Sequence, residues 1–266
     1  MTCSVALPKA SKSQDLFPDK NLEAVVRREV FEKRESKEPL VPKDVENISQ
    51  IKGVGKGIQN LKGLEACKSL RSIELSKNAI VDLTPLKELN LLQQLILKDN
   101  QIKEVSPLKD LVKLQHLDLD NNQLEKIDSL GAFSNMRSFY VGGNRIQDIG
   151  VVANYTKIWS LYVQGNPVSD LKPISQLRFL DHLDISRTGV ADLSPLSGLG
   201  RLKRVLMEES KVTDLEVLVA MAKKDASGPT RFSPFWNLHL KGCPLTEQAK
   251  TSQVNELKKL GGRIHF

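Results

Sequence analysis

The residues best suited to chemistry are two pairs of histidine and aspartate with the same spacing. His116 and Asp118 form one pair, followed by Asp120, and His182 and Asp184 form the other. Side chains at i and i+2 of a strand point to one face, so each pair could act as a general acid and base or supply part of a metal site. No serine or cysteine nucleophile joins either pair at a recognisable spacing. We therefore expect polar surface residues, no enzymatic activity and no metal or other cofactor.

The cysteines and one glycine-rich string carry weaker signals. Cys3, Cys67 and Cys243 lie far apart and form no CxxC pair, which argues against a zinc or redox centre. Residues 53–57 read GVGKG, but a phosphate-binding loop of this type needs a strand before it and a helix after it. We predict that Cys67 is a small buried hydrophobic residue and that the glycines bind no phosphate.

A repeat of 22 residues supplies the elements that position these groups. Apolar residues stand three and five positions before each repeated asparagine and two positions after it, which gives the pattern LxxLxLxxNxL through seven repeats. Thr188 and Ser210 take the asparagine position in the last two. The alternation of apolar and polar residues predicts a short, half-buried strand in every repeat. The repeated asparagines are Asn78, Asn100, Asn122, Asn144 and Asn166.

The asparagines predict a ladder of side-chain hydrogen bonds along the repeats. The turn after each strand leaves buried backbone N–H and C=O groups that cost free energy unless they are paired. An asparagine amide has two donors and an acceptor, so it can bridge successive turns. A hydroxyl does only part of this, and we expect the ladder to be weakest at Thr188 and Ser210.

The return path of the repeat carries proline at a fixed phase. Segments 82–86, 104–108, 170–174 and 192–196 read DLTPL, EVSPL, DLKPI and DLSPL. Proline fixes φ and cannot donate a backbone hydrogen bond, which favours a 3-10 or extended convex side over a full helix. The pattern predicts an α/β solenoid, a right-handed, curved stack with a parallel sheet on its concave side.

Atypical sequences at both ends predict caps over the core of the stack. Residues 1–13 are expected to be a disordered tail and 14–47 a helical N-terminal cap, whose helix runs to about Lys33. The repeats are expected over 48–222, and the first is degenerate because Lys56 replaces the asparagine.

An insertion of 11 residues precedes the last repeat. Its composition predicts a loop over 223–234. The last strand and a C-terminal cap of helix and strand are expected over 235–266, with Phe235 in a core position. The loop would either extend a binding face or shield the core.

The phase of the repeat also predicts which side chains cover the concave face. Tyr140 and Tyr162 are expected to be exposed neighbours, Trp159 to lie at the edge of the same surface, and Gly142 with two nearby glycines to leave open space. Exposed Tyr and Trp are frequent at interaction hot spots, although such rings can also simply pack across strands. The predicted partner-binding residues are Tyr140, Tyr162, Trp159, His116, Asp118, Asp120, His182 and Asp184.

The repeat resembles a known class of proteins. The LxxLxLxxNxI strand with its D-L-S/T-P-L return is similar to the 22-residue leucine-rich repeats of internalins and related bacterial surface proteins. Residues 17–27 resemble the helical cap of secreted members, and 243–248 with 257–266 resemble their closing helix and strand. The resemblance covers about residues 14–266 and implies an extracellular or periplasmic module for recognition or adhesion.

Charge and hydropathy narrow the class of partner. The formal net charge is +7, with the basic excess in the terminal segments and a balanced middle. A nucleic-acid reader would gather its cations on one face, so we predict a monomer that binds a protein, with carbohydrate or a surface polymer as the alternative, and no nucleic acid. No run approaches the ~20 apolar residues of a membrane span.

A different location leads to a competing function. The first residues lack the apolar core of an intact signal peptide, so secretion would require a leader removed from ahead of Met1. Without such a leader, the chain would be a cytoplasmic regulatory subunit of an enzyme such as a protein phosphatase.

Overall fold

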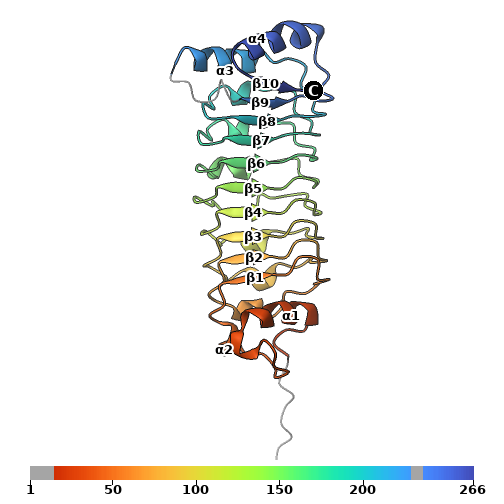
Figure 1. The fold of residues 1–266 in the computed structure, drawn as a ribbon, viewed down its shortest axis with the longest axis vertical. Coiled ribbons are helices and arrows are strands. Elements are labelled where there is room, and N and C mark those ends of the chain that lie inside the picture. Colours follow the sequence, from red (N-terminus) through yellow and green to blue (C-terminus); the bar gives the residue numbers. More distant parts are fainter. Residues whose placement is uncertain (1–14, 229–235) are drawn as a thin grey trace, which may run out of the picture.

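The chain forms one elongated stack of turns in a computed structural model that describes residues 15–228 and 236–266 (Figure 1). The expected tail over 1–13, Phe235 and residues 229–234 of the expected insertion loop lie outside the described residues. Within the described part, a parallel sheet of ten strands runs along one side, and each strand pairs with the next in the sequence. The strands are Gln50–Lys52 (β1), Ser72–Glu74 (β2), Gln94–Ile96 (β3), His116–Asp118 (β4), Ser138–Tyr140 (β5), Ser160–Tyr162 (β6), His182–Asp184 (β7), Arg204–Leu206 (β8), Asn237–His239 (β9) and Arg263–His265 (β10).

Each strand from β1 to β9 buries its middle residue and presents the residues on either side of it to the opposite face. Leu95, Leu117 and Phe139, in the middle of β3, β4 and β5, are fully buried. The apolar residue two positions further on, such as Leu97 or Leu119, is also buried, since side chains at i and i+2 of an extended segment point to the same side. One continuous aliphatic core therefore runs the length of the stack, as the repeat pattern predicted.

The repeated asparagines connect each turn to the one before it. The Asn122 amide nitrogen donates to the Leu97 carbonyl of the preceding turn at 3.1 Å and to the Leu119 carbonyl of its own turn at 3.0 Å. Its Oδ1 accepts from the Ile102 amide at 3.0 Å. The same three kinds of bond occur at Asn78, Asn100, Asn144 and Asn166.

The hydroxyl that replaces asparagine in the sixth repeat bonds only within its own turn. Thr188 Oγ1 donates to the Ile185 carbonyl at 2.6 Å and accepts from the Val190 amide at 3.4 Å. In the next turn, the Val212 amide lies 3.5 Å from Ser210 Oγ. The described hydrogen bonds of these side chains therefore do not reach back to the preceding turn's carbonyl as the asparagine bonds do.

The sharp turn after each strand places the residue before the asparagine position in the left-handed region. Lys77, Asp99 and Asn121 have φ values of 58°, 57° and 54°. Glycine occupies the same position at Gly143 and Gly165, with φ of 64° and 67°. The turn geometry is thus the same in these repeats, although only some of them have glycine, which adopts a positive φ without steric cost.

The back of the stack is built of short 3-10 turns, as the prolines predicted. Four of these turns have proline as their second residue, and a preceding acidic side chain stabilises each of them. Asp82 Oδ1 accepts from the Thr84 amide at 2.8 Å, and Glu104 Oε1 accepts from the Ser106 amide at 2.8 Å. The 3-10 turns along the repeats are Leu64–Ala66 (η2), Thr84–Leu86 (η3), Ser106–Leu108 (η4), Gly150–Asn154 (η5), Lys172–Ile174 (η6) and Ser194–Leu196 (η7).

At the N-terminal end, helix α1 (Lys20–Glu29) covers β1 (Figure 1). The Asp19 carboxylate accepts from the amides of the first helical turn and, through Oδ2, from the Gln59 amide at 2.7 Å, which links the helix to the first repeat. The helix ends before Lys33, the expected end, because Val30 is extended; a 3-10 turn (Phe31–Lys33) follows. A second short helix, α2, spans Pro42–Val45.

The glycine string has a backbone explanation. A Cβ on Gly53 would lie 2.8 Å from Cγ2 of Val25 in α1, so only glycine allows the helix to approach the first strand this closely. Gly55 takes the left-handed turn position, with φ of 63°. The nearby Cys67 is fully buried, and burial raises the pKa of its thiol to about 12, as suits a small hydrophobic residue.

At the C-terminal end, helix α3 (Glu216–Ala226) packs against a π-helical turn (Ala249–Gln253) and helix α4 (Val254–Lys259). Residues 223–226 are helical and differ from the loop expected there. The final strand, β10, pairs with β9 and ends the sheet. None of the helices in the described part of the chain is long and apolar enough to cross a membrane.

Candidate functional site

Strand register aligns one outward residue of each repeat into a central column on the sheet. Each three-residue strand presents its first and third residues on this face, and successive strands pair without a shift. Because adjacent strands lie about 4.8 Å apart, side chains in the column are direct neighbours. The column runs through Glu74, Ile96, Asp118, Tyr140, Tyr162, Asp184, Leu206, His239 and His265.

An aromatic cluster occupies the middle of this column. The Tyr140 and Tyr162 rings stack with centroids 4.4 Å apart and planes at 19°. His116 meets the Tyr140 ring edge-on at 5.2 Å. All three side chains are half-buried, and burial, followed by the neighbouring Tyr140, raises the pKa of Tyr162. The contacts among the three rings hold them in one cluster on the sheet.

Trp159 belongs to a different part of the surface from the tyrosines. It lies one residue before β6, its ring is 53% exposed, and the Arg137 guanidinium lies 5.8 Å from the ring centroid. It shares a groove of about 640 Å³ with His182 and His239. Of the predicted binding residues, Tyr140, Tyr162 and His116 lie in the ring cluster, and Trp159 and His182 line this groove. The three predicted aspartates belong to neither group.

The predicted carboxylates are held by backbone amides of the sheet. Asp118 Oδ1 accepts from the Asp120 amide at 3.0 Å, and Asp184 Oδ1 accepts from the Ser186 amide at 2.9 Å. Burial raises the pKa of both groups. Burial lowers the pKa of His116, which favours its neutral form. Among the described residues, no group of three or more His, Cys, Asp or Glu side chains is placed to hold a metal ion.

Asp120 has the least surface of the predicted set. Its side chain accepts from the Gly142 amide of the next turn at 2.6 Å, and the residue is 7% exposed. Burial and the adjacent Asp118 raise its pKa to about 6. The carboxylate thus faces the sheet's own backbone far more than solvent.

The open space expected beside Gly142 does not exist. A Cβ built there would lie within 2.2–2.6 Å of the Gln164 side-chain amide, which crosses from the next strand to within 3.5 Å of Asp120 Oδ2. The expectation was wrong at this position because a glycine frees space that a long neighbouring side chain then fills.

The groove beside Trp159 contains residues that the sequence did not single out. His239 and His265 stack with centroids 4.4 Å apart and planes at 20°. Lys203 and Arg204 also line the groove. His239 is the third residue of β9 and so lies in the central column, whereas His265 lies in the cap, outside the asparagine-based register. Only the pairing of β9 with β10 brings the two rings together.

Comparison with known proteins identifies the fold. A family model for leucine-rich repeats (two copies) matches residues 91–135. The structure of internalin C2 from Listeria monocytogenes is similar with a TM-score of 0.63 at 23% identity, over 94% of this chain and 93% of that one. This chain has a leucine-rich repeat solenoid fold that is similar to that of internalin C2.

More distant leucine-rich repeat proteins share the solenoid. One from Leptospira interrogans has a TM-score of 0.59 at 17% identity, over 78% of this chain and 57% of that one. The ectodomain of the Arabidopsis thaliana receptor kinase GASSHO1/SCHENGEN3 has a TM-score of 0.62 at 16% identity, over 76% of this chain and 25% of the receptor chain. No curated protein sequence matches the chain.

Proposed function

We propose that this leucine-rich repeat solenoid is a non-enzymatic recognition or adhesion module that docks a protein partner on its sheet. The observation that carries the proposal is the stacked, half-buried pair of Tyr140 and Tyr162, with His116 against its edge. Tyrosine is enriched among the few residues that dominate the free energy of many interfaces. Asp118 and Asp184, on either side of the pair in the column, would orient the partner.

The leucine-rich repeat fold supports a protein as the partner. The solved structure of GASSHO1/SCHENGEN3 is a complex with CASPARIAN STRIP INTEGRITY FACTOR 2, and that of the plant peptide hormone receptor RGFR1, similar at a TM-score of 0.56, is a complex with RGF2. The likeness to internalin C2 favours an extracellular or periplasmic location. In this proposal the buried asparagines form a ladder that keeps the binding strands in register.

The decisive experiment removes both tyrosine rings. Proteins retained by the immobilised chain are identified, purified and titrated against the wild type and the Tyr140→Ala, Tyr162→Ala double variant. We expect at least tenfold weaker binding by the double variant, since hot-spot truncations cost about 2 kcal/mol or more. Val81→Ala serves as the matched control, because Val81 is 49% exposed and lies outside the column.

Two outcomes bear directly on the proposal. Equal affinity of the double variant and the wild type for the purified partner would overturn it. If the rings only stabilise the fold, unfolding experiments will show a loss of about 0.2–1 kcal/mol for this cross-strand pair while the affinity stays the same.

A further inference from the structure

The turns that lead into the strands hold most of the chain's excess positive charge. Seven five-residue segments, each ending at the first residue of a strand from β2 to β8, contain nine Lys and Arg and one Asp. All nine cations are exposed. We call this surface the basic flank. Its segments are 68–72, 90–94, 112–116, 134–138, 156–160, 178–182 and 200–204.

The opposite flank, where the chain leaves the strands, is nearly neutral. Its seven four-residue segments, which begin two residues before each asparagine position, contain five Lys and Arg and four Asp and Glu. The middle of the chain is balanced in sequence, but the solenoid separates the charges by phase. An anionic partner would therefore be attracted to one flank and not to the other.

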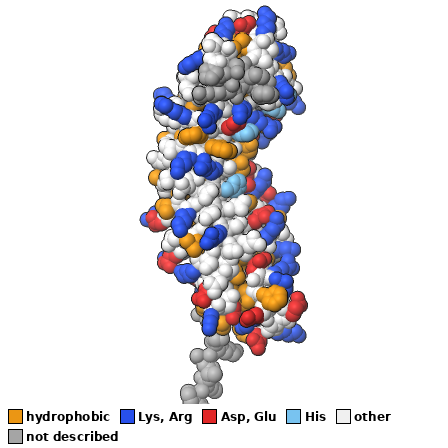
Figure 2. Space-filling model, turned by 60° about the vertical axis from the view of Figure 1, so that its left-hand side comes forward, with side chains coloured by type: hydrophobic (Ala, Val, Ile, Leu, Met, Phe, Trp, Pro, Cys, Tyr) orange, Lys and Arg blue, Asp and Glu red, His pale blue; other side chains and the backbone are white. Residues whose placement is uncertain are grey.

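Exposed aromatic side chains lie among these cations. Trp159 is 53% exposed and Phe179 is 44% exposed. The Arg137 guanidinium lies 5.8 Å from the Trp159 ring centroid, and the Arg201 guanidinium lies 5.2 Å from that of Phe179. On the face shown in Figure 2, hydrophobic side chains form a group with Lys and Arg side chains above and below it. The surface thus pairs apolar area with positive charge, and two of the nine cations, Lys68 and Lys203, have a carboxylate at 3.4 and 3.1 Å.

The groove beside Trp159 gives this surface a shape. It extends from Trp159 to His265 across strands β6 to β10, has a volume of about 640 Å³, and is lined by Lys203 and Arg204. Five strands at about 4.8 Å spacing span about 19 Å, the length of about six extended residues. Asp181 is the one carboxylate among its described lining residues, and its Oδ2 lies 3.1 Å from Lys203 Nζ.

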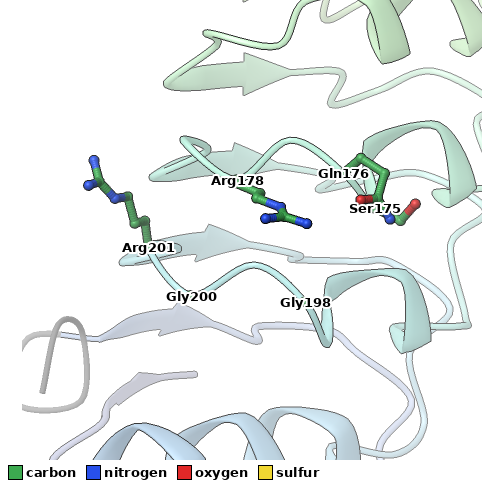
Figure 3. A pocket seen from close by; sticks show the side chains of 6 residues that line it. All are labelled: Ser175, Gln176, Arg178, Gly198, Gly200 and Arg201. Atoms are coloured by element: carbon green, nitrogen blue, oxygen red, sulfur yellow. The ribbon is translucent and has the colours of Figure 1, made fainter. Parts of the chain in front are cut away.

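A second hollow continues the basic flank toward the back. It has a volume of about 310 Å³ and lies between two turns, with Arg178 reaching into it and Arg201 at its outer edge (Figure 3). Gly198 and Gly200 line its other side without side chains. Segment 201–204 therefore places Arg201 at one hollow and Lys203 and Arg204 at the other.

We propose that the basic flank binds an acidic, extended segment of a protein partner. The partner's carboxylates pair with Arg201, Lys203 and Arg204, and an apolar side chain packs on Trp159. One face of each aromatic ring is covered by an arginine, so the rings do not form the open stacking platform that favours nucleic-acid bases. This inference rests on the proposed function, because it assumes that the partner is a protein.

The test uses a defined probe in place of the natural partner. A fluorescein-labelled 12-residue peptide of alternating Glu and Leu is titrated by anisotropy against the full chain at low salt, beside an isomer in which Gln replaces Glu. We expect binding of the Glu peptide alone, weakened at least tenfold by Arg201→Gln, Lys203→Gln, Arg204→Gln and by raised salt. The matched control is Lys103→Gln, Lys126→Gln, Lys172→Gln, which removes the same charge from exposed positions outside the flank.

Tryptophan fluorescence locates the bound peptide. The chain has two tryptophans, and Trp236 is fully buried, so a shift on peptide binding reports Trp159. The inference is overturned if the flank variant binds the Glu peptide as the wild type does, if the Gln peptide binds equally, or if a 20-nucleotide single strand binds more tightly than the peptide. The Tyr140→Ala, Tyr162→Ala variant should keep its affinity for the peptide, so a failure here is distinct from a failure of the concave site.

Discussion

Asn122 shows what one side chain contributes to this fold. Its amide pairs two carbonyls and one backbone N–H in the core, two of them in the preceding turn. No strand partner is available to these groups, because they lie where the chain leaves the sheet. A side chain that cannot both donate and accept leaves several buried polar groups unpaired.

We expect Asn122→Ala to lower the free energy of unfolding by about 3 kcal/mol, since each buried group left unpaired costs about 1–3 kcal/mol. Urea denaturation measures the difference. Asn135→Ala is the control, because Asn135 is exposed and its described side-chain bond is to Lys157 Nζ. Equal losses for the two variants would contradict a structural role for the buried amide.

Asp120 makes stability depend on pH. Burial raises its pKa from 3.8 to about 6, so the folded state binds a proton more tightly than the unfolded state. Stability from this group is fully present below pH 3.8 and is lost as the pH rises through about 6. We expect Asp120→Asn, relative to the wild type, to gain about 2 kcal/mol between pH 4 and pH 7. Denaturation curves of both proteins at the two pH values measure this, and a constant difference would exclude it.

For single residues, the burial and the hydrogen bonds of the asparagines could be predicted from the sequence. The burial of Asp120 and its effect on stability could not. A polar residue that recurs at the same position of every repeat, between apolar core positions, indicates a buried side chain without any knowledge of its neighbours. Asp120 was placed correctly on the sheet face, but the amide of Gly142 and the crossing side chain of Gln164 belong to later turns. The position of a residue within the repeat predicts which way its side chain points. It does not predict which groups of other turns contact that side chain.

Among the elements, the turn after each strand sets the most restrictive backbone requirement. Gly165→Ala retains the space, since the new Cβ lies 3.5 Å from the nearest atom, but φ of 67° strains any residue with a Cβ. We expect a loss of about 1 kcal/mol in the free energy of unfolding. Gly200→Ala is the matched control, with open space around its Cβ and no positive φ. If the control loses as much as Gly165→Ala, turn strain is not the cause.

The strands and 3-10 turns were predictable because repetition supplies the same evidence many times. Helix α3 was not predicted, since the repeats were expected to continue to residue 222 and a loop to follow; it forms because Leu218, Val219, Met221 and Ala222 bury one face against the C-terminal helices. That packing involves residues some 30 positions later. The repeat pattern cannot predict an element that occurs once and is stabilised by segments far away in the sequence.

For the whole molecule, charge was the property least visible in the sequence. When charged residues are counted along the chain, the middle of the chain is neutral. When they are counted by their position in the repeat, one flank is basic and the other is nearly neutral. The position of a residue within its repeat decides on which side of the solenoid it lies. The net charge of a long segment therefore mixes both flanks and conceals the pattern. The tyrosine pair was predictable because Tyr140 and Tyr162 are spaced by one repeat. The histidine stack was not predictable, because His265 follows the irregular cap.

At the asparagine position, the described side-chain bonds to the previous turn stop at Asn166, are missing at Thr188 and Ser210, and resume at Cys243, whose Sγ donates to the Met207 carbonyl at 2.9 Å. The turns of Thr188 and Ser210 therefore lack a tie that the earlier turns have. We expect transient opening to begin in the C-terminal turns, so the Val190 and Val212 amides should exchange with deuterium faster than those of Ile80 and Ile102. Thr188→Asn should extend the tied part by one turn and slow exchange there. Uniform exchange along the rod would show that packing alone holds it together.

The groove beside Trp159 lies over the C-terminal turns, which we expect to open most readily. A partner would find there a surface that can adjust to it.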